Sequence, residues 1–136
     1  MKCFIPILFA AICIKLVSCT KQELPLNENY IQVNKCQTYT IDNQNITLCL
    51  DSITQDSRCP IDVVCIWQGL AVARFNLKAQ NKDHLITLAT MKFAPYSRDT
   101  TIAGFKIEFI GLTPQTDTRK PFNYRDYIAE VKISKL

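Results

Sequence analysis

The chain of 136 residues has the length of a single domain, and its 48% hydrophobic and 21% charged content is typical of a folded globular protein and excludes a disordered one. Its net charge of +4 falls to +2 without the first 18 residues, which hold two lysines and no acid. A charge this small argues against a nucleic-acid-binding protein, which needs a clustered basic face.

The N-terminal residues have the pattern of an export signal. Lys2 gives a positive start, and the apolar run from Phe4 to Ile14 is shorter than the roughly 20 residues of a membrane-spanning helix. The run is followed by Leu16-Val17-Ser18-Cys19. This ending resembles the lipobox of bacterial lipoproteins, in which the cysteine is acylated, with palmitate among its chains, and becomes the new N-terminus. We therefore expect lipid on Cys19; the alternative is an ordinary signal peptide with an incidental cysteine.

The cysteine count supports export. Of seven cysteines, three leave with the signal or take the lipid, and four remain in the expected domain: Cys36, Cys49, Cys59 and Cys65. An even number of cysteines in an exported chain predicts disulfides. We favour the two pairings between sequence neighbours, Cys36 with Cys49 and Cys59 with Cys65. The alternative leaves Cys36 and Cys49 free and buried.

These features divide the chain into a signal peptide at residues 1–18, a lipidated cysteine and tether at 19–29, and one β-domain at 30–136. The tether is polar, without hydrophobic periodicity. Within the domain, residues 30–34 and 37–41 are short runs rich in residues that favour strands. Residues 46–53 alternate apolar and polar side chains, which predicts a half-buried strand.

Residues 56–69 interrupt the strands and contain the only tryptophan and one of the three glycines. We interpret them as a disulfide-closed loop that turns the chain, with Trp67 packed onto the core. Asp56 and Arg58 flank the first cysteine of the loop. We interpret the two as a local ion pair that shapes the turn; the alternative is a recognition pair on a rigid loop.

Four further strands are expected at 70–77, 84–91, 102–112 and 127–133. The first two are joined by a polar connection and predict a hairpin. Gly104 lies near the start of the third strand, where a glycine can accommodate a bulge. Residues 93–100 are expected to form a loop, and residues 113–123 are the longest polar connection.

No segment has the 3.6-residue apolar period of an amphipathic helix. About seven short strands separated by turn residues predict an all-β fold. We expect an antiparallel β-sandwich, with a small β-barrel as the alternative.

The segment from Asp56 to Ala71 reads D-S-R-C-P-x4-C-x-W-x-G-x-A. It resembles a segment of small exported bacterial proteins, many of them lipoproteins of unknown function, in which it lies between two β-strands. The resemblance is specific over about 16 residues and loose in the flanking strands. It implies an envelope location and a disulfide-closed turn. It implies no activity, so no catalytic residue is carried over.

The chain shows no coherent catalytic or metal-binding set. His84, the only histidine, has no nucleophile near it in sequence, and we interpret it as an exposed residue at a strand start. The spacing of Cys59 and Cys65 is wider than that of structural zinc sites, so no metal or other cofactor is expected.

Four side chains are candidates for binding: Arg58, Trp67, Arg119 and Lys120. The last two lie in the long polar connection, where they could contact an anionic sugar or phosphate. Each candidate also has a plainer interpretation, as a turn-forming ion pair, a core residue or a solvated loop residue.

Our main hypothesis is a non-enzymatic envelope lipoprotein, held at the outer membrane through Cys19, that binds an envelope protein or glycan as a binding or accessory module. One alternative is an inhibitor, whose rigid Cys59–Cys65 loop enters the cleft of an envelope or secreted hydrolase. Another is an envelope enzyme or redox protein with a reactive thiol at one of these cysteines.

Overall fold

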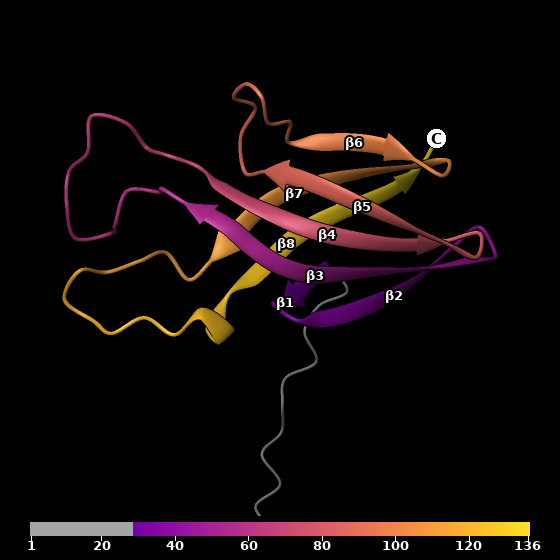
Figure 1. Cartoon of the computed structure of the whole chain (residues 1–136), viewed down its shortest axis with the longest axis horizontal. Helices are drawn as coiled ribbons and strands as arrows, with labels where there is room; N and C mark the ends of the chain where they lie inside the picture. The colour runs from indigo at the N-terminus through magenta and orange to yellow at the C-terminus, as the bar shows by residue number, and fades with distance from the viewer. Residues whose placement is uncertain (1–28) are drawn as a thin grey trace, which may run out of the picture.

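The protein is a β-sandwich of two four-stranded antiparallel sheets, seen in a computed structural model that describes residues 29–136 (Figure 1). The first sheet has the order β1-β8-β7-β6, with β1 at Tyr30–Gln32, β6 at Asp99–Ile102, β7 at Phe105–Thr113 and β8 at Ile128–Lys135. The second has the order β2-β3-β4-β5, with β2 at Lys35–Ile41, β3 at Gln44–Asp56, β4 at Ala71–Ala79 and β5 at Lys82–Ala89. The all-β sandwich is confirmed, and the two sheets do not close into a barrel.

The predicted signal peptide, lipidated Cys19 and nearly all of the tether lie outside the described residues. Within residues 29–136 the only helical element is the single 3-10 turn Tyr124–Asp126. No helix among them has the length and hydropathy that crossing a bilayer requires.

The core lies between the sheets and follows from the alternation of apolar side chains along the strands. Leu48 and Leu50 of β3 are fully buried, as are Phe75 of β4 and Phe109 of β7. The two phenylalanine rings meet edge-on across the sandwich, with centroids 5.4 Å apart. The largest fully buried side chains are all apolar, so transfer of their surface out of water is the main contribution that holds the sheets together.

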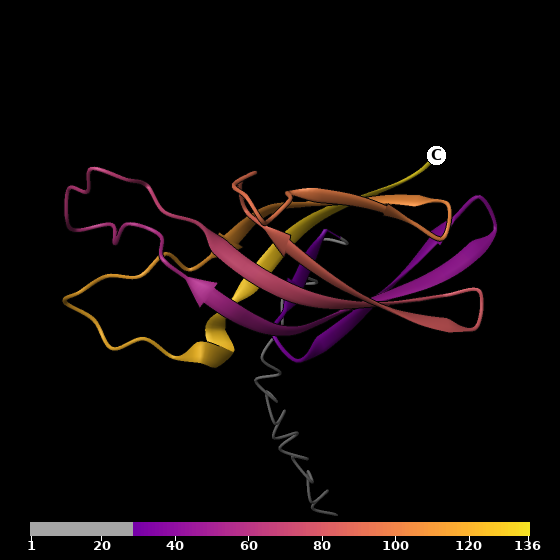
Figure 2. The same cartoon turned by 45° about the horizontal axis from the view of Figure 1, so that its top comes forward.

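Three tight hairpins lie together at one end of the sandwich, which we call the turn end (Figures 1 and 2). Each turns through two residues with positive φ: Asp42–Asn43, Gln80–Asn81 and Ala103–Gly104. Consecutive positive φ values match the right-handed twist of the flanking strands.

The third of these hairpins shows that the predicted strand 102–112 begins too early, because the strand in this region, β7, begins at Phe105. Gly104 belongs to a hairpin turn rather than a bulge, and Ile102 ends the short strand β6.

The opposite end, which we call the loop end, carries the long connections. These are residues 57–70 between β3 and β4, residues 90–98 between β5 and β6, and residues 114–127 between β7 and β8. The first and third project side by side from the sandwich in both views (Figures 1 and 2). The disulfide loop singled out in the sequence thus lies beside the longest polar connection.

Candidate functional site

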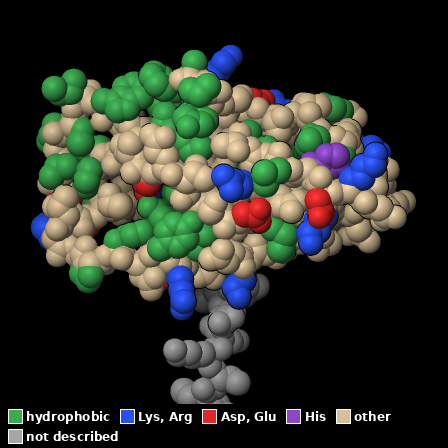
Figure 3. All heavy atoms as spheres, viewed as in Figure 1, with side chains coloured by type: hydrophobic (Ala, Val, Ile, Leu, Met, Phe, Trp, Pro, Cys, Tyr) green, Lys and Arg blue, Asp and Glu red, His purple; other side chains and the backbone are tan. Residues whose placement is uncertain are grey.

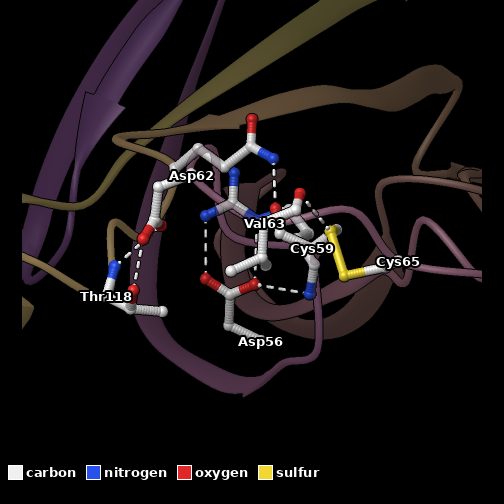
Figure 4. Close-up of a disulfide and its surroundings, with 8 residues drawn as sticks. Asp56, Cys59, Asp62, Val63, Cys65 and Thr118 are labelled. Atoms are coloured by element: carbon white, nitrogen blue, oxygen red, sulfur yellow. Dashed lines mark hydrogen bonds and ion pairs between the residues drawn. A yellow bond between two sulfur atoms is a disulfide. The ribbon is translucent and has the colours of Figure 1, made fainter.

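The two disulfides are those favoured from the sequence. Cys36 and Cys49 are directly opposed on β2 and β3 and bridge the two strands. Cys59 and Cys65 close a small ring within residues 57–70, with their Cα atoms 5.9 Å apart (Figure 4). Two disulfides fit an oxidising, non-cytoplasmic compartment. The second one makes the 59–65 segment, which we call the ring, a closed unit.

The base of the ring is held by a short ladder of backbone hydrogen bonds. The Ser57 N–H donates to the Leu70 carbonyl at 2.9 Å, and the Cys59 N–H donates to the Gln68 carbonyl at 2.9 Å. Gly69 lies between these two bonds with φ of +69°, and a Cβ atom there would lie 1.8 Å from the Ser57 carbonyl oxygen. Only glycine therefore lets the two limbs of the connection approach this closely.

A cluster of charged and phenolic groups joins the ring to the other sheet. The carboxylate of Asp56 accepts from Nε and Nη2 of Arg58, each at 2.8 Å, and from the hydroxyl of Tyr127 at 2.6 Å. Arg58 also donates to the carbonyl groups of Leu112 and Pro114. The side chains of Arg58 and Asp56 are only 12% and 10% exposed. The expected turn-shaping ion pair is therefore present, and the guanidinium that was a binding candidate faces inward, occupied by these partners.

The pKa values in this cluster reflect its hydrogen bonds. Burial by itself would raise the pKa of Asp56, but the hydrogen bonds from Arg58 and Tyr127 outweigh it and hold that pKa below its ordinary value of 3.8. Burial, together with the hydrogen bond to Asp56, raises the pKa of the Tyr127 phenol. Asp56 is therefore ionised and Tyr127 neutral at neutral pH, as the hydrogen bonds require.

The tip of the ring is tied to the 114–127 connection by three further contacts. The Ile61 N–H donates to the Thr116 carbonyl at 2.9 Å, and the Gln115 amide donates to the Cys59 carbonyl. The carboxylate of Asp62 accepts from the Thr118 N–H at 2.9 Å and from the Thr118 hydroxyl (Figure 4). These hydrogen bonds from Thr118 lower the pKa of Asp62. The two projecting connections therefore brace one another.

Large hydrophobic side chains gather on this braced end. Of the ten large hydrophobic residues that are exposed within residues 29–136, only Leu85 and Leu136 lie elsewhere. The eight at the loop end are Ile61, Val63, Val64, Ile66, Trp67, Phe93, Phe122 and Tyr124. In Figure 3 hydrophobic side chains crowd the left part of the visible face, over this end, whereas charged side chains lie mostly over the right and lower parts. Val64 and Ile66 protrude completely, at 103% and 111% relative exposure.

The interpretation of Trp67 as a core residue is wrong. Its side chain is 52% exposed, and its ring packs against Phe93 of the 90–98 connection, with centroids 5.4 Å apart. The core is already filled by Phe75, Phe105 and Phe109, which leaves no need for an indole. Trp67 instead joins two connections of the loop end and presents the rest of its ring to solvent.

A hollow of about 730 Å³ lies between the ring and the start of the 90–98 connection. Its lining includes Pro60, Val63 and Val64 of the ring, with Thr90 and Met91 opposite. The lining also includes Arg58, Gln68 and Gln115, and it contains no histidine, aspartate or glutamate that could act as a catalytic acid or base.

The other sequence-predicted residues lie apart from this hollow. Arg119 and Lys120 are 68% and 76% exposed, and both contact Asp117, whose side chain is only 6% exposed. His84 is partly exposed on β5 and is paired with Leu77 across the β4–β5 hairpin. In residues 29–136 no group of three or more histidine, cysteine, aspartate or glutamate residues is arranged to hold a metal ion.

Compared with protein-family models, with curated proteins and with solved structures, the chain shows no significant match to any of them.

Proposed function

We propose that this protein is a non-enzymatic, lipid-anchored binding module of the bacterial cell envelope, and that its contact surface is the loop end. The observation that carries this proposal is the gathering of eight exposed large hydrophobic side chains on one end of the domain. Contiguous exposed apolar patches of this kind mark interaction sites in soluble domains. The turn end, where the hairpins are tight and polar, has no comparable patch.

The bracing of the loop end supports the same proposal. The ring is fixed by its disulfide, by the Asp56–Arg58–Tyr127 cluster and by the Asp62–Thr118 contacts. A surface that is already rigid loses little conformational entropy on binding, so more of its contact free energy appears as affinity. The polar groups of these contacts thus hold the shape of the ring, while the apolar side chains face outward.

The proposed anchor predicts a defined mass for protein taken from the native membrane. We expect the mature chain to begin at Cys19 and to carry acyl groups there. Alkylation should find no free thiol before reduction and four after it, because Cys36, Cys49, Cys59 and Cys65 are paired. Intact-mass spectrometry with and without reduction measures both quantities. An unacylated chain would remove the anchor from the proposal, and ready alkylation of Cys59 or Cys65 before reduction would favour a redox protein.

The contact surface itself can be mapped by photo-crosslinking in the native envelope. A photoreactive residue in place of Ile66 should yield strong adducts, whereas the same residue in place of Leu85 should yield few. The two positions are matched, since both side chains are exposed, at 111% and 67%, but Leu85 lies on the outer face of β5 rather than at the loop end. Equal labelling from the two positions would contradict the loop end as the contact surface.

A second candidate function is inhibition of a hydrolase, and the shape of the ring favours it. Val64 protrudes fully from the disulfide-closed ring, and Ile66 protrudes directly after it, as a side chain entering a cleft must. The two side chains that protrude completely are those of Val64 and Ile66. Adducts from position 66 to the active-site cleft of one hydrolase, with loss of its activity, would establish this function instead.

A further inference from the structure

We propose that the loop end docks on an anionic phospholipid surface, with Val64, Ile66 and Trp67 entering the interface between headgroups and acyl chains. This inference rests on the proposed function, because it names what the contact surface touches. It adds a second, reversible contact to the membrane beside the lipid on Cys19.

The shape and chemistry of the protruding side chains are those of an interfacial anchor. Val64 and Ile66 extend beyond the surface at full exposure, so their apolar area is free for transfer out of water. Trp67 and Phe93 form a pair of contacting rings beside them. Indole rings favour the membrane–water interface, where the ring is apolar and its N–H remains hydrated.

The charges of the loop end complement an anionic surface. Residues 57–70, 90–98 and 114–127 carry six basic and three acidic side chains. Two of the acids are turned inward, with Asp62 and Asp117 each only 6% exposed, whereas Lys92, Arg119 and Lys120 face solvent. Asp126 is the one exposed acid in these connections, and it adjoins the exposed Arg125. Arg58 and Arg98 are offset by Asp56 and Glu108 of the adjoining strands, so the loop end has an excess of one positive charge, with six bases against five acids. One excess lysine or arginine near an anionic membrane contributes about 1 kcal/mol of attraction.

The distance from the lipid to the domain permits this contact. Residues 20–29 separate Cys19 from β1, and ten residues span at most about 35 Å. A domain held this close meets the bilayer at a high effective concentration, so even a weak interfacial affinity keeps the loop end docked. Docking would fix the orientation of the sandwich, with the turn end directed away from the membrane.

Trp67 is the only tryptophan, so its fluorescence reports the position of the loop end directly. The full lipidated protein would be reconstituted into vesicles of phosphatidylethanolamine and phosphatidylglycerol. We expect Trp67 emission to move to shorter wavelength, to be quenched by lipids brominated on their acyl chains, and to be shielded from an aqueous quencher. In vesicles of phosphatidylcholine alone these effects should be much smaller.

Two sets of variants control the measurement. Val64→Ser with Ile66→Ser should weaken docking at least tenfold, because two exposed aliphatic side chains no longer transfer to the interface. Both positions are fully exposed, so the fold should be unaffected. Leu85→Trp in a Trp67→Phe background places the reporter on β5, away from the loop end, where it should remain open to the aqueous quencher.

The inference is overturned if the aqueous quencher reaches Trp67 equally well in two samples. One is the lipidated protein in anionic vesicles, and the other is the delipidated protein in solution without detergent. If position 66 nonetheless crosslinks to one envelope protein, the loop end remains the contact surface and only its lipid partner is wrong. If neither lipid nor protein contacts position 66, the proposed contact surface fails as well.

Discussion

Replacing Gly69 by alanine is expected to lower the free energy of unfolding by about 3 kcal/mol or more. The new Cβ atom would lie 1.8 Å from the Ser57 carbonyl oxygen, and backbone atoms of both limbs would have to move. The residue would also keep a φ of +69°, which non-glycine residues adopt at a cost. Movement of the limbs would break the bonds from Ser57 to Leu70 and from Cys59 to Gln68. Denaturant unfolding measures the loss.

Gly104→Ala is the matched control for this prediction. Gly104 has a φ of +82°, similar to that of Gly69, but nothing lies within 4 Å of the position its Cβ would take. Gly104→Ala therefore places alanine at a positive φ without a steric clash, and we expect the free energy of unfolding to fall by only about 1 kcal/mol. Equal losses at the two glycines would mean that the limbs of the 57–70 connection separate freely, which would contradict a rigid ring.

Asp56→Asn is expected to lower the free energy of unfolding by about 2–4 kcal/mol. The substitution keeps the shape of the side chain but removes the charge that faces Arg58 and accepts the Tyr127 hydroxyl. It leaves an arginine that is 12% exposed without its counter-charge. The matched control is Asp99→Asn, because Asp99 pairs with Lys106 at 3.0 Å in solvent, where both side chains are more than 40% exposed. Little change is expected there, because exposed ion pairs contribute little.

The same pair of variants tests the pH dependence. Since the folded state holds the pKa of Asp56 below 3.8, the stability that Asp56 contributes is fully present above that pH and is lost as the pH falls through its lowered pKa. Unfolding measured from pH 5 downward should therefore show a smaller acid loss in Asp56→Asn than in the wild type. An unchanged acid loss would show that Asp56 is not stabilised as an anion in the folded protein.

Local sequence patterns predicted most of the fold. The alternation in 46–53 and 127–133 placed β3 and β8 to within a few residues, because burial of one sheet face imposes a period of two. The run 70–77, apolar on both faces, placed β4 as a central strand. The strand β6 at Asp99–Ile102 was missed since four residues are too few to show a period. The turn at Ala103–Gly104 was missed because a non-glycine residue with positive φ is not a usual turn signal.

The candidate site was predictable only in its local part. The Cys59–Cys65 bridge and the Asp56–Arg58 pair join near neighbours in the chain, so their spacing indicated them. The partners Tyr127 and Thr118 come from a distant connection, and nothing in the sequence pairs them with the ring. Trp67 was assigned to the core from its residue type and its position just after a disulfide, since the sequence does not show that phenylalanines already fill the core.

The construction of the ring separates the residues that hold its shape from those that meet its surroundings. The shape depends on Gly69, the two cysteines, the Asp56–Arg58 pair and the Asp62–Thr118 contact, together with backbone hydrogen bonds. Val64 and Ile66 contribute nothing to it, because they lie wholly outside. Their positions can therefore change freely during evolution, and exchange of these side chains would retarget the domain while its folding stayed the same.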